Sequence, residues 1–156
     1  MCRLFLFFSL CFSALNADFL HVDSPSARLS DFVYKTPNDG VVKIPKDVKI
    51  VIASFEKETG ALVNSYLQSQ DTAYLSEHQA VFIADISKMP SVITTMFAIP
   101  KLKKYKHPIH INYSEGFDTV VPAKEDMVTL LFVENAKIKE IRYAATKDEL
   151  KAAIEK

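Results

Sequence analysis

The chain has 156 residues and equal numbers of basic and acidic side chains, 19 of each, so its formal net charge is zero. This length suits a single domain that can bury a hydrophobic core. A hydrophobic content of 49% argues against intrinsic disorder, and the balanced charge argues against a nucleic-acid-binding surface. No apolar run reaches the roughly 20 residues that a membrane-spanning helix requires.

The N-terminus has the layout of a secretory signal peptide. A short basic start, Met1–Arg3, precedes an apolar stretch, Leu4–Phe12, and the small residue Ala17 stands before Asp18. We therefore predict that export removes residues 1–17 and leaves a periplasmic or secreted protein without a transmembrane span. An uncleaved membrane anchor is the alternative, although the apolar stretch is short for spanning a bilayer.

Both cysteines of the chain, Cys2 and Cys11, lie in the segment that export would remove. The mature chain would then have no disulfide, no thiolate ligand and no thiol redox couple. We predict no bound cofactor. Residues 18–30 are predicted to be a polar lead-in, and residues 31–156 a single domain.

The predicted elements follow one another in an order typical of an α/β fold. In chain order they are strands at 32–35, 41–44 and 48–55, a helix at 59–70, a strand at 80–86, a helix starting near Pro90, strands at 108–113, 127–133 and 138–144, and a helix from 146. Asp39-Gly40 predicts a tight hairpin turn, because Gly tolerates positive φ. Thr59 is a plausible N-cap, and Thr146 to Glu149 form a capping box. Strand, helix and strand over 48–86 predict a right-handed parallel crossover.

The helix that starts near Pro90 has more apolar residues than one buried stripe needs. On a helical wheel, one broad arc holds Met89, Val92, Ile93, Met96 and Phe97, and we expect the sheet to bury most of this set. Ile99 lies apart from most of them and is left over with part of the remainder, and Pro100 should kink or end the helix. The candidate contact residues for a partner are therefore Met89, Met96, Phe97, Ile99 and Pro100, and we expect the partner to be a protein of the cell envelope. The lysines from Lys101 to Lys106 predict a solvated helix end, or docking on an anionic surface.

This order of elements resembles the thioredoxin fold of peroxiredoxins and TlpA-like proteins. Asp31-Phe32 and the stretch from Asn38 to Pro45 are similar to the opening DF…DG..V.L motif of that group, and residues 130–138 are similar to its closing FLID.DGKI hairpin. The resemblance covers roughly residues 31–155. It implies an α/β, thioredoxin-like three-layer sandwich with an N-terminal β-hairpin, a mixed sheet and a C-terminal helix.

The resemblance also implies where chemistry would occur, and there the chain departs from the family. The family's Cys-x-x-Cys, or single peroxidatic cysteine, belongs just after Phe55, where this chain has Glu56-Lys57-Glu58-Thr59-Gly60. The family's cis-proline precedes the closing hairpin, where this chain has Met127, with Pro122 five residues earlier. Because thiol exchange needs a thiolate, we predict a thioredoxin fold without thioredoxin chemistry.

Two other classes of function remain open from the residues. A cysteine-free enzyme could use Asp85, His110 or Glu58 in a cleft at the strand ends. A copper carrier could use Met89 and Met96 with a nearby histidine, and His107 and His110 form a second metal candidate. We expect simpler roles instead, namely a cap for Asp85, core packing for the methionines, and one loop histidine and one packed histidine. The sequence therefore favours a non-catalytic binding or accessory domain over an enzyme.

Overall fold

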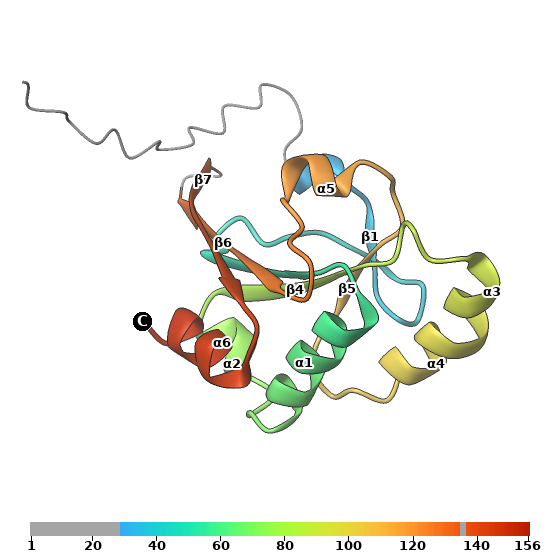
Figure 1. Cartoon of the computed structure of the whole chain (residues 1–156), viewed down its shortest axis with the longest axis horizontal. Helices are drawn as coiled ribbons and strands as arrows, with labels where there is room; N and C mark the ends of the chain where they lie inside the picture. The colour runs from blue at the N-terminus through green and yellow to red at the C-terminus, as the bar shows by residue number, and fades with distance from the viewer. Residues whose placement is uncertain (1–28, 135–136) are drawn as a thin grey trace, which may run out of the picture.

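Seven strands form one mixed sheet in the computed structural model, which describes residues 29–134 and 137–156 (Figure 1). The predicted signal peptide and most of the lead-in lie outside the described residues. In sheet order the strands are β2 (Val41–Val42), β1 (Tyr34–Lys35), β5 (His110–Asn112), β4 (Ala80–Asp85), β3 (Ile50–Ser54), β6 (Val128–Glu134) and β7 (Lys137–Ala144). The helical elements are η1 (Leu29–Asp31), α1 (Lys57–Gln68), α2 (Tyr74–Glu77), α3 (Ser91–Ile93), η2 (Thr94–Ala98), α4 (Ile99–Leu102), α5 (Phe117–Val120) and α6 (Lys147–Ile154).

The centre of the sheet is parallel and its two sides are antiparallel. Strand β4 pairs in parallel with β3 on one side and with β5 on the other. Strands β6 and β7 form the antiparallel closing hairpin next to β3, and β1 pairs antiparallel with both β5 and β2. Helix α1 connects β3 to β4, as the predicted crossover requires.

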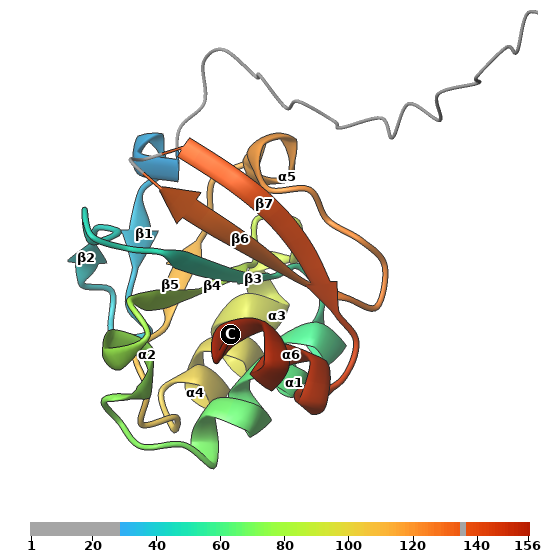
Figure 2. The ribbon, with the colours of Figure 1, turned by 90° about the vertical axis from the view of Figure 1, so that its left-hand side faces the viewer.

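Every residue of β3 and β4 is buried, because helical elements cover both faces of the sheet. On one face, Ile50 and Ile52 belong to a core that includes residues of α1, α2 and α6, with Ile99 and Leu102 packed against it. On the other face, Val51 and Ala53 pack in a second core formed largely with α5 and the chain around η1. Figure 2 shows the two helical layers on either side of the sheet.

The fold class agrees with the prediction, while several local details differ from it. Helix α1 starts at Lys57 with Glu56 as its N-cap, so Thr59 is the N3 residue of a capping box and not the N-cap. In the N-terminal hairpin, Asp39 and not Gly40 has positive φ, at 64°. The short helices α2 and α5 lie where the sequence analysis predicted no helix or strand. Within the described residues, no helix is long and apolar enough to cross a membrane.

Candidate functional site

The turn after β3, where the resemblance places chemistry, is closed by hydrogen bonds among its own groups. The backbone N–H of Glu56 donates to Thr59 Oγ1 over 3.2 Å, and the Thr59 hydroxyl donates to the Glu56 carbonyl over 3.1 Å. Thr59 is buried, whereas Lys57 and Glu58 are exposed. The turn therefore uses its one buried hydroxyl to begin α1.

The loop before β6 lies against this turn. The backbone N–H of Asp126, whose φ is 57°, donates to Glu56 Oε2 over 3.1 Å. Thr129 of β6 also contacts this loop, since its Oγ1 donates to the Pro122 carbonyl over 2.8 Å. No cis peptide bond occurs in the described part of the chain, so this loop reaches β6 entirely through trans bonds. Glu56 thus joins two loops whose residues are 70 positions apart, and its carboxylate has a structural role.

Asp85, at the carboxyl end of β4, belongs to a hydrogen-bonded turn. Its Oδ1 accepts from the Ser87 backbone N–H over 3.1 Å and from Asn112 Nδ2 over 3.0 Å. The buried Asn112 side chain also donates to the Ser114 carbonyl over 2.8 Å. This arrangement fixes the chain after β4 to the chain after β5, which is a capping role for Asp85.

The two histidines of the metal candidate lie in different surroundings. His107 is 6% exposed, and its Nε2 lies 2.9 Å from Asn64 Oδ1. Burial lowers the pKa of His107 to about 4, and Lys106 shifts it in the same direction, so the ring is neutral and Nε2–H donates to Asn64. His110 packs edge-on against Tyr34, and burial lowers its pKa as well. The Nδ1 atom of each ring is buried without a hydrogen-bond partner, so a metal ion would reach either atom only if neighbouring groups moved.

The candidate contact residues lie on a helix that is continuous from residue 91 to residue 102 and that comprises α3, η2 and α4. We call it the α3–α4 helix. Its middle section, η2, is π-helical, and the Ile99 N–H donates to the Thr94 carbonyl five residues back. Pro100 has no N–H, and in an α-helix its ring would clash with the carbonyl of Met96. The wider π turn accommodates this proline, and the helix does not end at Pro100 but continues to Leu102.

The burial of the α3–α4 helix differs from the prediction. The sheet was expected to bury most of the arc from Met89 to Phe97, yet four of its side chains are exposed: Val92, Ile93, Met96 and Phe97, at 63%, 44%, 64% and 64%. We call these four the apolar face. Ile99, which was expected to be left over, packs against the core together with Met89 and Leu102. Of the candidate contact residues, Met96, Phe97 and Pro100 are therefore exposed, while Met89 and Ile99 are partly buried.

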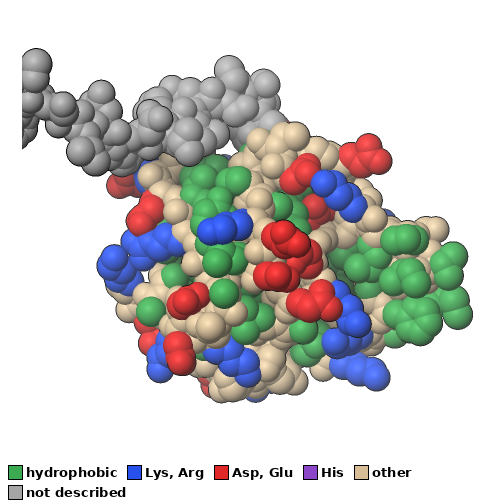
Figure 3. Space-filling view, in the orientation of Figure 1, with side chains coloured by type: hydrophobic (Ala, Val, Ile, Leu, Met, Phe, Trp, Pro, Cys, Tyr) green, Lys and Arg blue, Asp and Glu red, His purple; other side chains and the backbone are tan. Residues whose placement is uncertain are grey.

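Figure 3 shows a continuous hydrophobic surface over the α3–α4 helix at one end of the molecule. Monomeric soluble proteins rarely expose several large apolar side chains side by side unless the surface binds something. The apolar face is therefore the strongest candidate site on the described surface.

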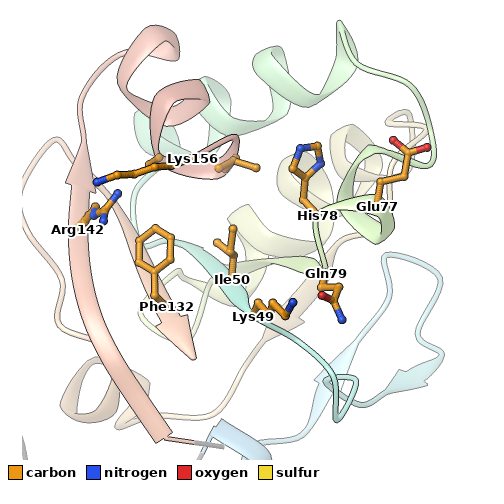
Figure 4. Close-up of a pocket in the computed structure, with 10 residues that line it drawn as sticks. Lys49, Ile50, Glu77, His78, Gln79, Phe132, Arg142 and Lys156 are labelled. Carbon is orange, nitrogen blue, oxygen red and sulfur yellow. The ribbon is translucent and has the colours of Figure 1, made fainter. Parts of the chain in front are cut away.

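A second candidate, a pocket of about 410 Å³, lies at the opposite end of β3 from the Glu56 turn (Figure 4). Ile50 and Phe132 form its base, with Arg142 and Lys156 on one side and His78 on the other. The Arg142 guanidinium lies 4.5 Å from the centre of the Phe132 ring and pairs with both carboxylate oxygens of Glu140. This pocket could not be predicted from the sequence, because its lining comes from five separate parts of the chain.

The remaining metal and enzyme candidates do not come together. In the described residues, no three side chains of His, Cys, Asp or Glu are grouped so that they could hold a metal ion. Met96 is exposed and Met89 packs against the core. No hydrogen bond or ion pair between described residues joins any two of Asp85, His110 and Glu58.

No protein-family model matches the sequence, and no curated protein matches it. Among solved structures, the chain is similar to a thioredoxin-like protein from Porphyromonas gingivalis, with 13% identity, coverage of 83% of this chain and 92% of that chain, and a TM-score of 0.52. It is also similar to a protein from Bacteroides thetaiotaomicron named for protein disulfide isomerase, with 10% identity, coverage of 80% and 81%, and a TM-score of 0.52. At these identities the similarity establishes the fold alone. The chain has a thioredoxin-like α/β fold.

Proposed function

We propose that this chain is an exported, non-catalytic binding or accessory domain that has kept the thioredoxin-like fold without thiol redox chemistry. It engages a component of the cell envelope through the apolar face of the α3–α4 helix. Export is supported by the signal-peptide pattern of residues 1–17. The domain then consists of residues 31–156, preceded by a short lead-in over residues 18–30.

The observation that carries the binding role is the apolar face itself. Val92, Met96 and Phe97 are each more than 60% exposed, and they lie at i, i+4 and i+5 on one side of a helix. Core packing does not account for them, because the same helix already contacts the core through Ile99 and Leu102. A binding partner would remove these side chains from water.

The lack of thiol chemistry is supported by the chain composition and by the Glu56 turn. The chain has two cysteines, and neither lies in residues 12–156. In the turn after β3, the Thr59 hydroxyl and the Glu56 carboxylate are both held in hydrogen bonds to the backbone. These bonds give both groups a structural role in the turn.

The test of this proposal compares redox activity with binding in the exported protein. Its melting temperature should not change on adding dithiothreitol, and it should neither reduce insulin nor consume peroxide. Pull-down from native envelope with the exported protein as bait should recover a component that a Met96→Ser, Phe97→Ser double variant does not recover. Redox activity in a preparation free of other oxidoreductases would contradict the proposal, and so would equal recovery by both proteins.

A further inference from the structure

We propose that the apolar face and the lysines that follow it dock the domain on an anionic lipid bilayer. Val92, Ile93, Met96 and Phe97 enter the boundary between headgroups and acyl chains, while Lys101, Lys103, Lys104 and Lys106 contact lipid phosphates. We call these four lysines the lysine array. The inference rests on the proposed binding function and replaces its expected protein partner with a lipid surface.

The charge of the chain is strongly uneven around this helix. Residues 86–114 contain five lysines and no aspartate or glutamate, while the other described residues contain 12 basic and 17 acidic side chains. One of the five lysines, Lys88, is neutralised by Asp118 at 2.7 Å. The other four form the lysine array, which begins in the last turn of the α3–α4 helix and continues directly after it.

The lysine array is free to contact a ligand. All four side chains are exposed, and within the described residues none of them takes part in an ion pair. A lysine near an anionic membrane surface contributes about fivefold to partitioning at low ionic strength. Four such cations beside a small apolar surface supply the two signals that stable, reversible membrane docking requires.

Two observations favour lipid over a protein partner or a second copy of the chain. Lysine is depleted from protein interfaces, whereas it is typical of the polar side of helices that lie in a membrane surface. The helix itself, from Ser91 to Leu102, has no acidic residue that could pair with the lysines of a second copy.

Acidic side chains on neighbouring elements limit which end of the domain can face the membrane. Glu58 is exposed in the first turn of α1, and Glu115 is exposed before α5. Figure 3 shows acidic side chains over the middle of this view, to the side of the hydrophobic surface. The domain therefore meets the membrane with the end that carries the α3–α4 helix, which keeps the acidic surface away from the lipid phosphates.

The test is cosedimentation of the exported protein, its N-terminus checked by intact mass, with vesicles. One set of vesicles contains equal parts of phosphatidylglycerol and phosphatidylethanolamine, and the other contains phosphatidylcholine alone. Binding should be confined to the anionic vesicles and should weaken as salt is added. The Lys103→Glu, Lys104→Glu variant should bind at least about tenfold more weakly, because two favourable charges become unfavourable ones. The Met96→Ser, Phe97→Ser variant should show a loss of similar size.

Matched controls separate this surface from general effects. Val41→Ser removes an equally exposed apolar side chain on β2, and Lys46→Glu reverses a charge outside the lysine array. Both should bind anionic vesicles within about twofold of the unchanged protein, since surface changes away from a binding site have little effect. Melting curves of all variants verify that each is folded.

Each outcome decides between the two proposals. Equal binding to both kinds of vesicle, or no loss in the variants, overturns lipid docking. If vesicles do not bind but the Met96→Ser, Phe97→Ser variant loses a captured protein, the surface serves a protein partner and the binding function stands. If neither vesicles nor an envelope component depends on the apolar face, both proposals are wrong.

Discussion

The turn after β3 and the α3–α4 helix after β4 occupy equivalent places in neighbouring strand–helix units, yet they are built in opposite ways. In the turn, Glu56, Thr59 and Asp126 satisfy one another's polar groups, and the site is closed. On the helix, four apolar side chains stay in water and four lysines have no ion-pair partner among the described residues. The turn where the sequence resemblance places chemistry is therefore stabilised as structure, while the apolar and cationic groups without partners belong to the next strand–helix unit.

The largest expected effect comes from a pair of substitutions on the two faces of the α3–α4 helix. Ile99→Glu places a carboxylate against the core, and we expect it to lower the free energy of unfolding by about 3 kcal/mol. Phe97→Glu, its matched control, places the same group in water and should change stability by less than about 0.5 kcal/mol. Urea denaturation measures both. Similar losses in the two variants would show that the helix packs through both faces.

The next effect is the dependence of folding stability on pH. The pKa of His107 is about 4 in the folded protein and 6.5 in the unfolded chain, so the unfolded chain binds more protons between these values. Stability is therefore complete above pH 6.5, falls as the pH drops towards 4, and levels off below that. We expect His107 to account for about 2 kcal/mol of the loss.

The measurement is urea denaturation at a series of pH values across this window. His107→Gln keeps a side-chain N–H donor for Asn64 and removes the titrating group, so its stability should depend less steeply on pH. Some slope should remain, because burial lowers the pKa of His110 in the same direction. An unchanged slope in the variant would show that His107 is not the group responsible.

The smallest effect tests whether the Glu56 turn is structural. Glu56→Ala removes the acceptor of the Asp126 N–H, and we expect a loss of about 1 kcal/mol. Glu58→Ala removes an exposed carboxylate in the same helical turn and should cost less than about 0.5 kcal/mol. Thermal unfolding of the two variants gives the comparison. Losses of the same size would assign the effect to the helix dipole and not to the link between the loops.

The elements with strong, long patterns could be predicted from the sequence. The apolar run at Ile50–Ser54 and its partner at Ala80–Asp85 are buried on both faces. In an α/β chain, a short continuous run of this kind is typical of a central strand of the sheet. The four-residue helices α2 and α5 could not be predicted, because four residues do not complete a period that separates helix from loop. The N-cap was placed at Thr59 and not at Glu56, because a threonine at N3 and a threonine at the N-cap look alike in sequence.

The candidate site shows that helical periodicity alone does not predict which face of a helix is buried. The sequence identified a helix with surplus apolar residues, but a helical wheel cannot say which of two apolar faces meets the sheet. Ile99 was expected outside and packs inside, because the π turn before Pro100 changes the angular position of everything after it. The pocket lined by Lys49 and Arg142 had no local pattern at all, since only the folded sheet brings these residues together.

The π turn between Thr94 and Ala98 has a consequence for how this surface tolerates changes in chain length. A π turn holds about one residue more than an α turn, and it has the form that a single-residue insertion leaves in a regular helix. The extra residue rotates the segment that follows it by roughly a quarter turn, about 100°. A length change of one residue can therefore decide whether side chains such as Ile99 and Leu102 face the core, without any change in their identity.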